Sequence, residues 1–174
     1  MGTLRPFSLI AQILAVLVFV TGAALAQGKQ ERPRYRDSTL PIEERVNDLL
    51  SRMTVEERVA QLQCTLRKIE WGKNLTVNGL GGVGPLLRSY VAGEAAEKAN
   101  EIQKLAVEKT RLGIPVIIHD EALHGLVSNK VTSFPQAIGL AATWNTELMS
   151  RVATVIGKET RARGIRQVLS PVVN

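Results

Sequence analysis

The stretch GIPVIIHDEALHG, residues 113–125, decides the fold class of this 174-residue chain. Its apolar run over residues 114–118 is short and β-branched, which predicts a fully buried strand of a parallel sheet. Both histidines of the chain and two carboxylates, Asp120 and Glu121, follow within a few residues. Because loops at the carboxyl ends of parallel strands carry the site in α/β folds, residues 119–124 are the first candidates for function.

Helical patterns alternate with short apolar segments along the rest of the chain. The spacing predicts helices that begin at Pro41, at a Thr54–Glu57 capping box, near Gly93 and at an Asn145 cap. Further strands are predicted at residues 83–87, 139–142 and 165–169. Strands that alternate with helices imply an α/β fold with a parallel sheet.

The same spacing predicts which side chains are buried. The helix after Thr54 is expected to bury Val55, Val59 and Leu62. The helix after Asn145 is expected to use Leu148, Val152, Val155 and Ile156, and to end before a C′ glycine, Gly164. The single cysteine, Cys64, excludes an intrachain disulfide and is expected to be a small buried hydrophobe.

The first 26 residues have the pattern of a secretory signal peptide. Arg5 precedes an apolar run over residues 9–20, and Ala24-Leu25-Ala26 predicts cleavage after Ala26. A membrane anchor is the alternative, but the uninterrupted run is shorter than the ~20 residues that a spanning helix needs. The mature protein is therefore expected to be secreted or periplasmic, with no membrane span after signal removal. Residues 27–40 are predicted to be an exposed linker, and residues 41–174 the folded domain.

The composition argues against a nucleic-acid partner. The chain has a formal net charge of +6, but its basic residues are dispersed, and only 4% of its residues are aromatic. A group near the end of the fourth helix is expected to be a solvated face: Lys158, Arg161, Arg163 and Arg166.

Residues 79–84 fit the pattern G-x-G-x-x-G, which occurs in dinucleotide sites. Such a site needs a strand before the glycines and a helix after them. Polar residues precede the glycines, and Pro85 follows them with no long helical pattern. A glycine-rich turn that enters a strand is therefore the prediction.

The segment of residues 119–124 leaves two interpretations open, a polar cluster at a strand end or a functional loop. Its histidines are five residues apart, which does not place both rings on one helix face as a zinc protease requires, so no metal site is predicted. Asp120 and Glu121 are adjacent, and adjacent side chains of extended backbone point to opposite sides. They could not flank one glycosidic bond as an acid and nucleophile do. At most one faces a ligand while the other holds the loop.

Four segments in matching order resemble the start of glycoside hydrolase family 3: residues 40–57, 113–125, 133–144 and 168–173. The resemblance implies that the chain is the amino-terminal part, about three βα units, of a (β/α)8 TIM-type barrel. It also implies an exo-acting retaining β-glycosidase that releases terminal β-linked glucose or xylose. The substrate would be a β-linked oligosaccharide or an aryl or alkyl glycoside.

The resemblance also implies roles for three residues. Glu121 would bind hydroxyls of the terminal sugar, Asp120 lies in the same substrate-binding loop, and His124 matches a structural histidine. The family's nucleophile and acid/base would lie beyond Asn174, so no catalytic residue, cofactor or metal is predicted here and the fragment is expected to be inactive alone. The alternative is a non-catalytic secreted carbohydrate-binding remnant.

Overall fold

The computed structural model describes residues 32–65, 75 and 77–172. The predicted signal peptide, residues 1–26, and the start of the predicted linker lie outside the described residues. None of the helices that the structure describes is long and apolar enough to cross a membrane. The chain divides into two compact units, residues 1–51 and 52–174, which are described separately.

The first unit holds the end of the predicted linker and most of helix α2 (Ile42–Arg52). Within the predicted linker, residues 27–40, the described part contains a short 3-10 helix, η1 (Arg34–Arg36). The Tyr35 amide donates to the Asp48 carboxylate at 3.0 Å, and Arg45 Nε donates to the Tyr35 carbonyl at 3.1 Å. The residues just before α2 are therefore tied to that helix.

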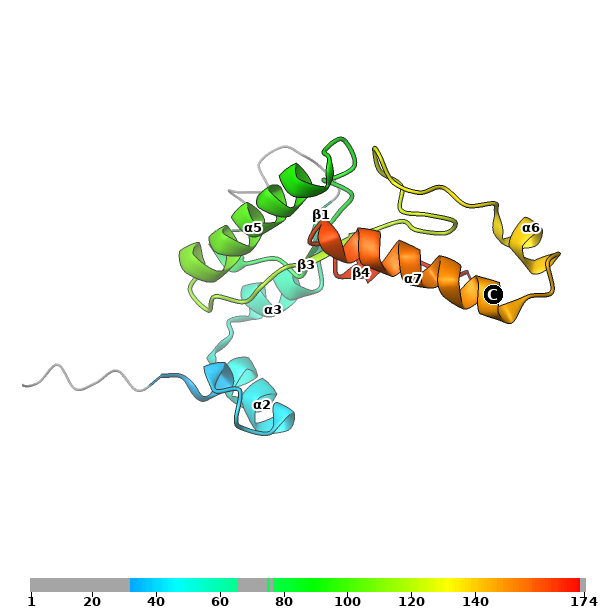
Figure 1. The fold of residues 1–174 in the computed structure, drawn as a ribbon. Helices are drawn as coiled ribbons and strands as arrows, with labels where there is room; N and C mark the ends of the chain where they lie inside the picture. Colours follow the sequence, from blue (N-terminus) through cyan, green and yellow to red (C-terminus); the bar gives the residue numbers. More distant parts are fainter. Residues whose placement is uncertain (1–31, 66–74, 76, 173–174) are drawn as a thin grey trace, which may run out of the picture. The chain divides into compact units, whose positions relative to one another are not determined.

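The second unit contains the sheet and its helices (Figure 1). Its elements are α3 (Val55–Gln61), β1 (Cys64–Thr65), β2 (Gly82–Val83), α5 (Ala92–Lys109), β3 (Ile117–Asp120), α6 (Ala137–Ala141), α7 (Thr146–Ala162) and β4 (Gln167–Val168). Within the described residues the sheet has four strands in the order β1-β2-β3-β4, and every pair is parallel. Helix α5 connects β2 to β3, and α6 and α7 lie between β3 and β4, as in consecutive units of a (β/α)8 barrel, which confirms the predicted fold class.

The central strand β3 begins later than predicted. The sequence indicated residues 114–118, but β3 covers Ile117–Asp120. Pro115 has no amide hydrogen to give to a ladder. The main chain of Val116 bonds instead to the Gln103 side chain of α5, which donates to its carbonyl at 2.7 Å and accepts from its amide at 3.1 Å. The Gln103 side chain therefore makes the hydrogen bonds that a neighbouring strand would make with Val116. The strand instead extends past the predicted end to include His119 and Asp120.

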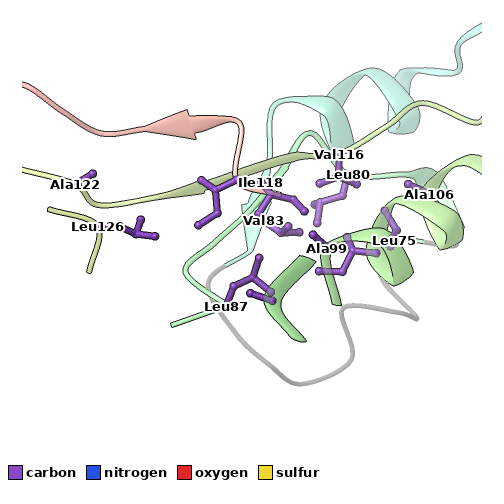
Figure 2. Close-up of a cluster of buried hydrophobic side chains, with 13 residues drawn as sticks. Leu75, Leu80, Val83, Leu87, Ala99, Ala106, Val116, Ile118, Ala122 and Leu126 are labelled. Carbon is purple, nitrogen blue, oxygen red and sulfur yellow. The ribbon is translucent and has the colours of Figure 1, made fainter. Parts of the chain in front are cut away.

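One apolar cluster lies between the sheet and the helices beside it. Figure 2 shows Val83 and Ile118, from neighbouring strands, gathered with Ala99 of α5. Ala99 is 2% exposed and Ile118 is 1% exposed, and Ile156 of α7 packs against the same cluster. The alanines of α5 let the helix approach the strands closely, because a methyl group is the smallest apolar side chain that fills the gap.

The predicted helix ends at α3 and α7 are confirmed. Thr54 Oγ1 accepts from the Glu57 amide and the Glu57 carboxylate accepts from the Thr54 amide, so the capping box is complete. The Asn145 side chain accepts from the Leu148 amide at 2.9 Å at the start of α7. Gly164 follows the last residues of α7 with φ of +79°, the left-handed conformation that a C′ glycine supplies.

The prediction of a strand at residues 139–142 is wrong. This segment lies largely in the short helix α6, with Gln136 as its N-cap. The amides of Gly139 and Leu140 donate to the Gln136 carbonyl at 2.9 and 3.1 Å, so the local chain supplies its hydrogen bonds. Small residues with weak strand preference adopt the helical turn that satisfies their own backbone groups.

Several predictions of burial are also wrong. Val55, Val59 and Leu62 are exposed, and the buried residues of α3 are Glu57 and Ala60. In α7, Val152 is buried but Val155 is 37% exposed. Cys64 is exposed on β1. Helical spacing identifies residues that share a face, but it does not identify which face the rest of the chain covers.

The glycine-rich segment is a turn that enters a strand, as predicted, but β2 covers Gly82–Val83 and not the predicted residues 83–87. The amide of Gly82 donates to the Gln63 carbonyl and the amide of Gly84 donates to the Thr65 carbonyl, each at 3.1 Å, while Gly81 bonds to Ala60. A Cβ on Gly81 would lie 1.9 Å from the Gln61 carbonyl oxygen, so only glycine fits there. These amides are used by the protein itself, which leaves none of the three for a phosphate.

Candidate functional site

The candidate site begins at the carboxyl end of β3, the strand that lies between β2 and β4. His119 pairs with Gln167 and Asp120 pairs with Val168 of β4, and Glu121 is the first residue after the strand. Side chains of a strand alternate between the two faces of the sheet. Ile118 and Asp120 are 1% and 2% exposed on the helix side, whereas Ile117 on the opposite face is 51% exposed.

The Asp120 carboxylate is fully surrounded by protein. Its Oδ1 atom accepts from Arg88 Nε at 2.8 Å and from Arg88 Nη2 at 2.6 Å. The same oxygen accepts from the Glu121 amide at 2.7 Å. The Asp120 side chain is 1% exposed, so this ion pair holds the turn after β3. One of the two adjacent acids was expected to hold the loop, and Asp120 has that position; the sugar-binding role of Asp120 remains a prediction.

Glu121 has the opposite surroundings. Its residue is half-buried, and its amide and carbonyl are both held, the carbonyl by the Val127 amide at 2.9 Å. Its carboxylate makes no hydrogen bond or ion pair with any residue that the structure describes. The backbone of Glu121 is thus fixed at both ends while its charged group is left for another partner.

His124 is held by the loop that follows β3. Its Nδ1 lies 3.0 Å from the Phe134 carbonyl oxygen, and its own carbonyl accepts from the Phe134 amide at 2.8 Å. Gly125 beside it has φ of +123°, and a Cβ there would lie 2.4 Å from the Thr132 carbonyl oxygen. These contacts close the loop, and they suit the structural role that the resemblance implies for His124.

The other histidine, His119, contacts different residues from those that hold His124. Both ring nitrogens of His119 are 3.8 Å from Cys64 Sγ, a weak contact across the open face of the sheet. Gly84 also approaches closely, because a Cβ there would lie 2.3 Å from the His119 carbonyl oxygen. Within residues 32–65, 75 and 77–172, no three His, Cys, Asp or Glu side chains are grouped so that they could hold a metal.

Arg163 is a buried structural residue that the sequence did not reveal. It was expected on a solvated face, but it is 2% exposed. Its Nη1 donates to the Tyr90 carbonyl at 2.7 Å and to Ser128 Oγ at 2.9 Å, and its Nη2 donates to the Asn129 carbonyl at 2.6 Å. Arg163 therefore joins the loop after β2 to the loop after β3. A lone basic residue beside a C′ glycine gives no signal of this role in the sequence.

An apolar groove of about 450 Å³ lies along α7 beside β4. Val152, Ile156 and Val168 line it, together with Thr160, whose Oγ1 is buried without a partner among the described residues. Glu121 and His124 do not line this groove. Its walls are mostly apolar, although Arg161, Arg166 and Gln167 contribute polar groups, and Ala122 and Leu123 of the loop after β3 also line it.

Comparison with known proteins gives the site a family context. Residues 54–174 match the "Glycosyl hydrolase family 3 N terminal domain". The chain is 35% identical, over 88% of its length, to a probable β-glucosidase C of Aspergillus flavus. It is 31% identical, over 79% of its length, to a periplasmic β-glucosidase/β-xylosidase of Dickeya chrysanthemi.

A solved β-glucosidase structure from Erythrobacter marinus is similar with a TM-score of 0.68 and 28% identity, and the match covers 82% of this chain. The chain spans 27% of the Aspergillus flavus protein, 24% of the Dickeya chrysanthemi protein and 20% of the solved chain. The strand order, the loop after β3 and these matches agree, and the chain belongs to glycosyl hydrolase family 3, whose N-terminal domain it matches over residues 54–174.

Proposed function

We propose that Glu121 binds hydroxyl groups of a terminal sugar in an exo-acting retaining β-glycosidase that releases β-linked glucose or xylose. One observation at the carboxyl end of β3 supports this proposal. The Asp120 carboxylate is hydrogen-bonded to Arg88 and to the Glu121 amide, whereas the carboxylate of half-buried Glu121 has no partner among the described residues. A carboxylate accepts two charge-assisted hydrogen bonds from neighbouring hydroxyls, which is a common way to hold a pyranose ring.

The acid and the nucleophile of the reaction are not assigned to this pair. Retaining glycosidases place two carboxyl groups about 5 Å apart on either side of the scissile bond. Asp120 is buried on the helix side of the sheet and forms an ion pair with Arg88. It therefore cannot lie opposite Glu121 across a scissile glycosidic bond. The role proposed for this loop is therefore binding and orientation of the sugar, which lowers the barrier by positioning.

The substrate class and the location rest on the relatives and on the sequence. Relatives are named β-glucosidase and periplasmic β-glucosidase/β-xylosidase, which favours β-linked glucosides and xylosides. Residues 1–26 have the pattern of a signal peptide, so we propose export to the periplasm or the medium, with cleavage after Ala26. The intact mass and amino-terminal sequence of the exported protein test this part directly.

The test of function uses the protein as its native source exports it. Turnover of p-nitrophenyl β-glucoside and β-xyloside is compared for the native protein, Glu121→Gln and the control Glu108→Gln, an exposed glutamate of α5. Loss of one charged acceptor is expected to lower kcat/KM about tenfold to a hundredfold, and the control is expected to keep the native value. Unchanged kcat/KM in Glu121→Gln would contradict the proposed role. Glu121-dependent binding of glucose or xylose without turnover would favour the carbohydrate-binding alternative.

A further inference from the structure

We infer that Arg88 is a positioning residue that fixes the Glu121 carboxylate through Asp120, an inference that rests on the sugar-binding role proposed for Glu121. Arg88 lies in the loop after β2, and Asp120 is the last residue of β3. The guanidinium directs two N–H groups, Nε and Nη2, to the one oxygen Oδ1 of Asp120, at 2.8 and 2.6 Å. This convergence fixes where that oxygen lies.

The same oxygen atom holds the backbone of Glu121. The Glu121 amide donates to Asp120 Oδ1 at 2.7 Å, so the atom that Arg88 fixes also fixes the first peptide after β3. Asp120 is 2% exposed, and a buried carboxylate that has lost its cation turns toward other donors or loses the geometry of its remaining bonds. Either response moves Oδ1 or weakens its bond to the Glu121 amide. Loss of Arg88 would therefore reach Glu121 without any contact between the two side chains.

The loop that carries Glu121 also returns to Arg88. The Arg88 carbonyl accepts from the Asn129 amide at 2.9 Å and from Ser128 Oγ at 3.0 Å. The Val127 amide donates to the Glu121 carbonyl at 2.9 Å. Arg88 thus contacts this loop at its start, through Asp120, and near its middle at residues 128–129, through its own backbone. A single residue of the neighbouring strand connection therefore holds two points of the loop that presents Glu121.

The test compares two arginines that each pair with a buried carboxylate. Arg88→Met removes the pair with Asp120, and the matched control Arg111→Met removes the pair with Glu57, which is not bonded to Glu121. In the natively exported protein, Arg88→Met is expected to lower kcat/KM for the p-nitrophenyl glycosides about tenfold to a hundredfold, because displaced binding groups cost that much. Arg111→Met is expected to keep native kcat/KM even though it too loses an ion pair.

A double-mutant cycle separates this inference from the proposed function. If Arg88 acts through Glu121, Arg88→Met has no further effect on kcat/KM in the Glu121→Gln protein. A normal kcat/KM in Glu121→Gln would refute the proposed function and this inference with it. Reduced kcat/KM in Glu121→Gln with a normal value in Arg88→Met would refute the inference alone.

Hydrogen exchange distinguishes positioning from direct contact of Arg88 with the sugar. In the ligand-free protein, Arg88→Met is expected to speed exchange of the amides of residues 121–123, and Arg111→Met is expected to leave it unchanged. Reduced kcat/KM with native exchange at these amides would overturn the positioning role. If Arg88→Met does not yield folded protein, Arg88→Lys is measured in its place. Lysine keeps the charge but not the paired donors, so an intermediate kcat/KM is expected. A native kcat/KM in Arg88→Lys would overturn the inference.

Discussion

Replacing Arg111 with methionine tests how the buried carboxylate of α3 stabilises the fold. Glu57 is 6% exposed and completes the capping box through its bond to the Thr54 amide at 2.9 Å. Arg111 Nε donates to Glu57 Oε1 at 2.9 Å, and Nη2 donates both to Glu57 Oε2 and to the Arg52 carbonyl, the latter at 2.7 Å. The substitution removes all of these donors and leaves a buried, charged acceptor with only its backbone partner.

The expected loss follows from the number and exposure of these bonds. Hydrogen bonds to charged groups contribute about 1.5–3 kcal/mol when they are buried. The Arg111 side chain is 54% exposed, so water replaces part of the interaction, and we expect the free energy of unfolding to fall by about 1–2 kcal/mol. The control Lys98→Met removes a cation from the exposed pair with Glu101, for which a much smaller loss is expected because water screens the pair.

The loss should also depend on pH, in a direction that the structure fixes. The hydrogen bonds from Arg111 hold the pKa of Glu57 below its ordinary value of 4.5. A group whose pKa is lowered by folding stabilises the native state above its unfolded pKa, and this stabilisation disappears as the pH falls through the folded pKa. The difference between the native protein and Arg111→Met is therefore largest near neutral pH and becomes smaller below about pH 4.

Urea unfolding followed by far-UV circular dichroism measures both effects. The free energy of unfolding is compared for the native protein, Arg111→Met and Lys98→Met at neutral pH and at about pH 3.5. A loss in Arg111→Met no larger than in Lys98→Met would refute the reasoning about the buried carboxylate. A difference that increases in acid would refute the sign of the pKa shift.

Two further predictions concern residues that end α7. Gly164→Ala is expected to cost about 2–4 kcal/mol, because φ is +79° and the new Cβ would lie 2.4 Å from Ala99 Cβ. Gly157→Ala lies inside α7 with nothing within 4 Å of the new Cβ, and it is expected to stabilise the fold by up to about 1 kcal/mol. A melting temperature higher for Gly164→Ala than for Gly157→Ala would contradict this. Arg163→Met is expected to cost about 2–4 kcal/mol, because it removes a buried guanidinium and its bonds to the Tyr90 and Asn129 carbonyls, whereas Arg161→Met on the exposed side changes less than about 0.5 kcal/mol. Equal melting temperatures for the two arginine variants would show that the buried guanidinium contributes nothing.

The local signals of the sequence predicted the helix ends well. The Thr54–Glu57 box, the Asn145 cap and the C′ glycine Gly164 each depend on residues within a few positions of one another. Such interactions form wherever those residues occur in that order, since the backbone groups that they satisfy are always present at a helix end. The predicted parallel sheet rested in the same way on the alternation of helical and apolar segments.

The errors come from partners that are distant in the sequence. Glu57 is buried because Arg111 reaches it from 54 residues away, and the strand at β3 is shifted because the Gln103 side chain takes the place of a ladder at Val116. The apolar residues of α3 predicted a buried face, but that face is exposed in the described chain. Residue spacing contains no information about which of these surfaces meets another part of the fold.

The candidate site was predicted only in part. The position of Glu121 after a buried strand came from local sequence, and so did the expectation that only one of the adjacent acids faces a ligand. The choice between them depends on Arg88, which lies 32 residues from Asp120 and has no pattern that marks it as a partner. The partners of Arg88 and Arg163, the two arginines that hold these loops, therefore could not be predicted from the sequence.

The bonds of Arg163 have a consequence for how the family can diverge. Tyr90, Asn129 and Lys130 contribute only carbonyl oxygens to this guanidinium, at 2.7, 2.6 and 3.5 Å. Every amino acid has that oxygen, so the side chains at these three positions are free to change without loss of the bonds, whereas no other residue offers the donors of arginine at position 163. Mutation can thus alter the side chains of the two loops that Arg163 joins while the path of their backbone stays the same.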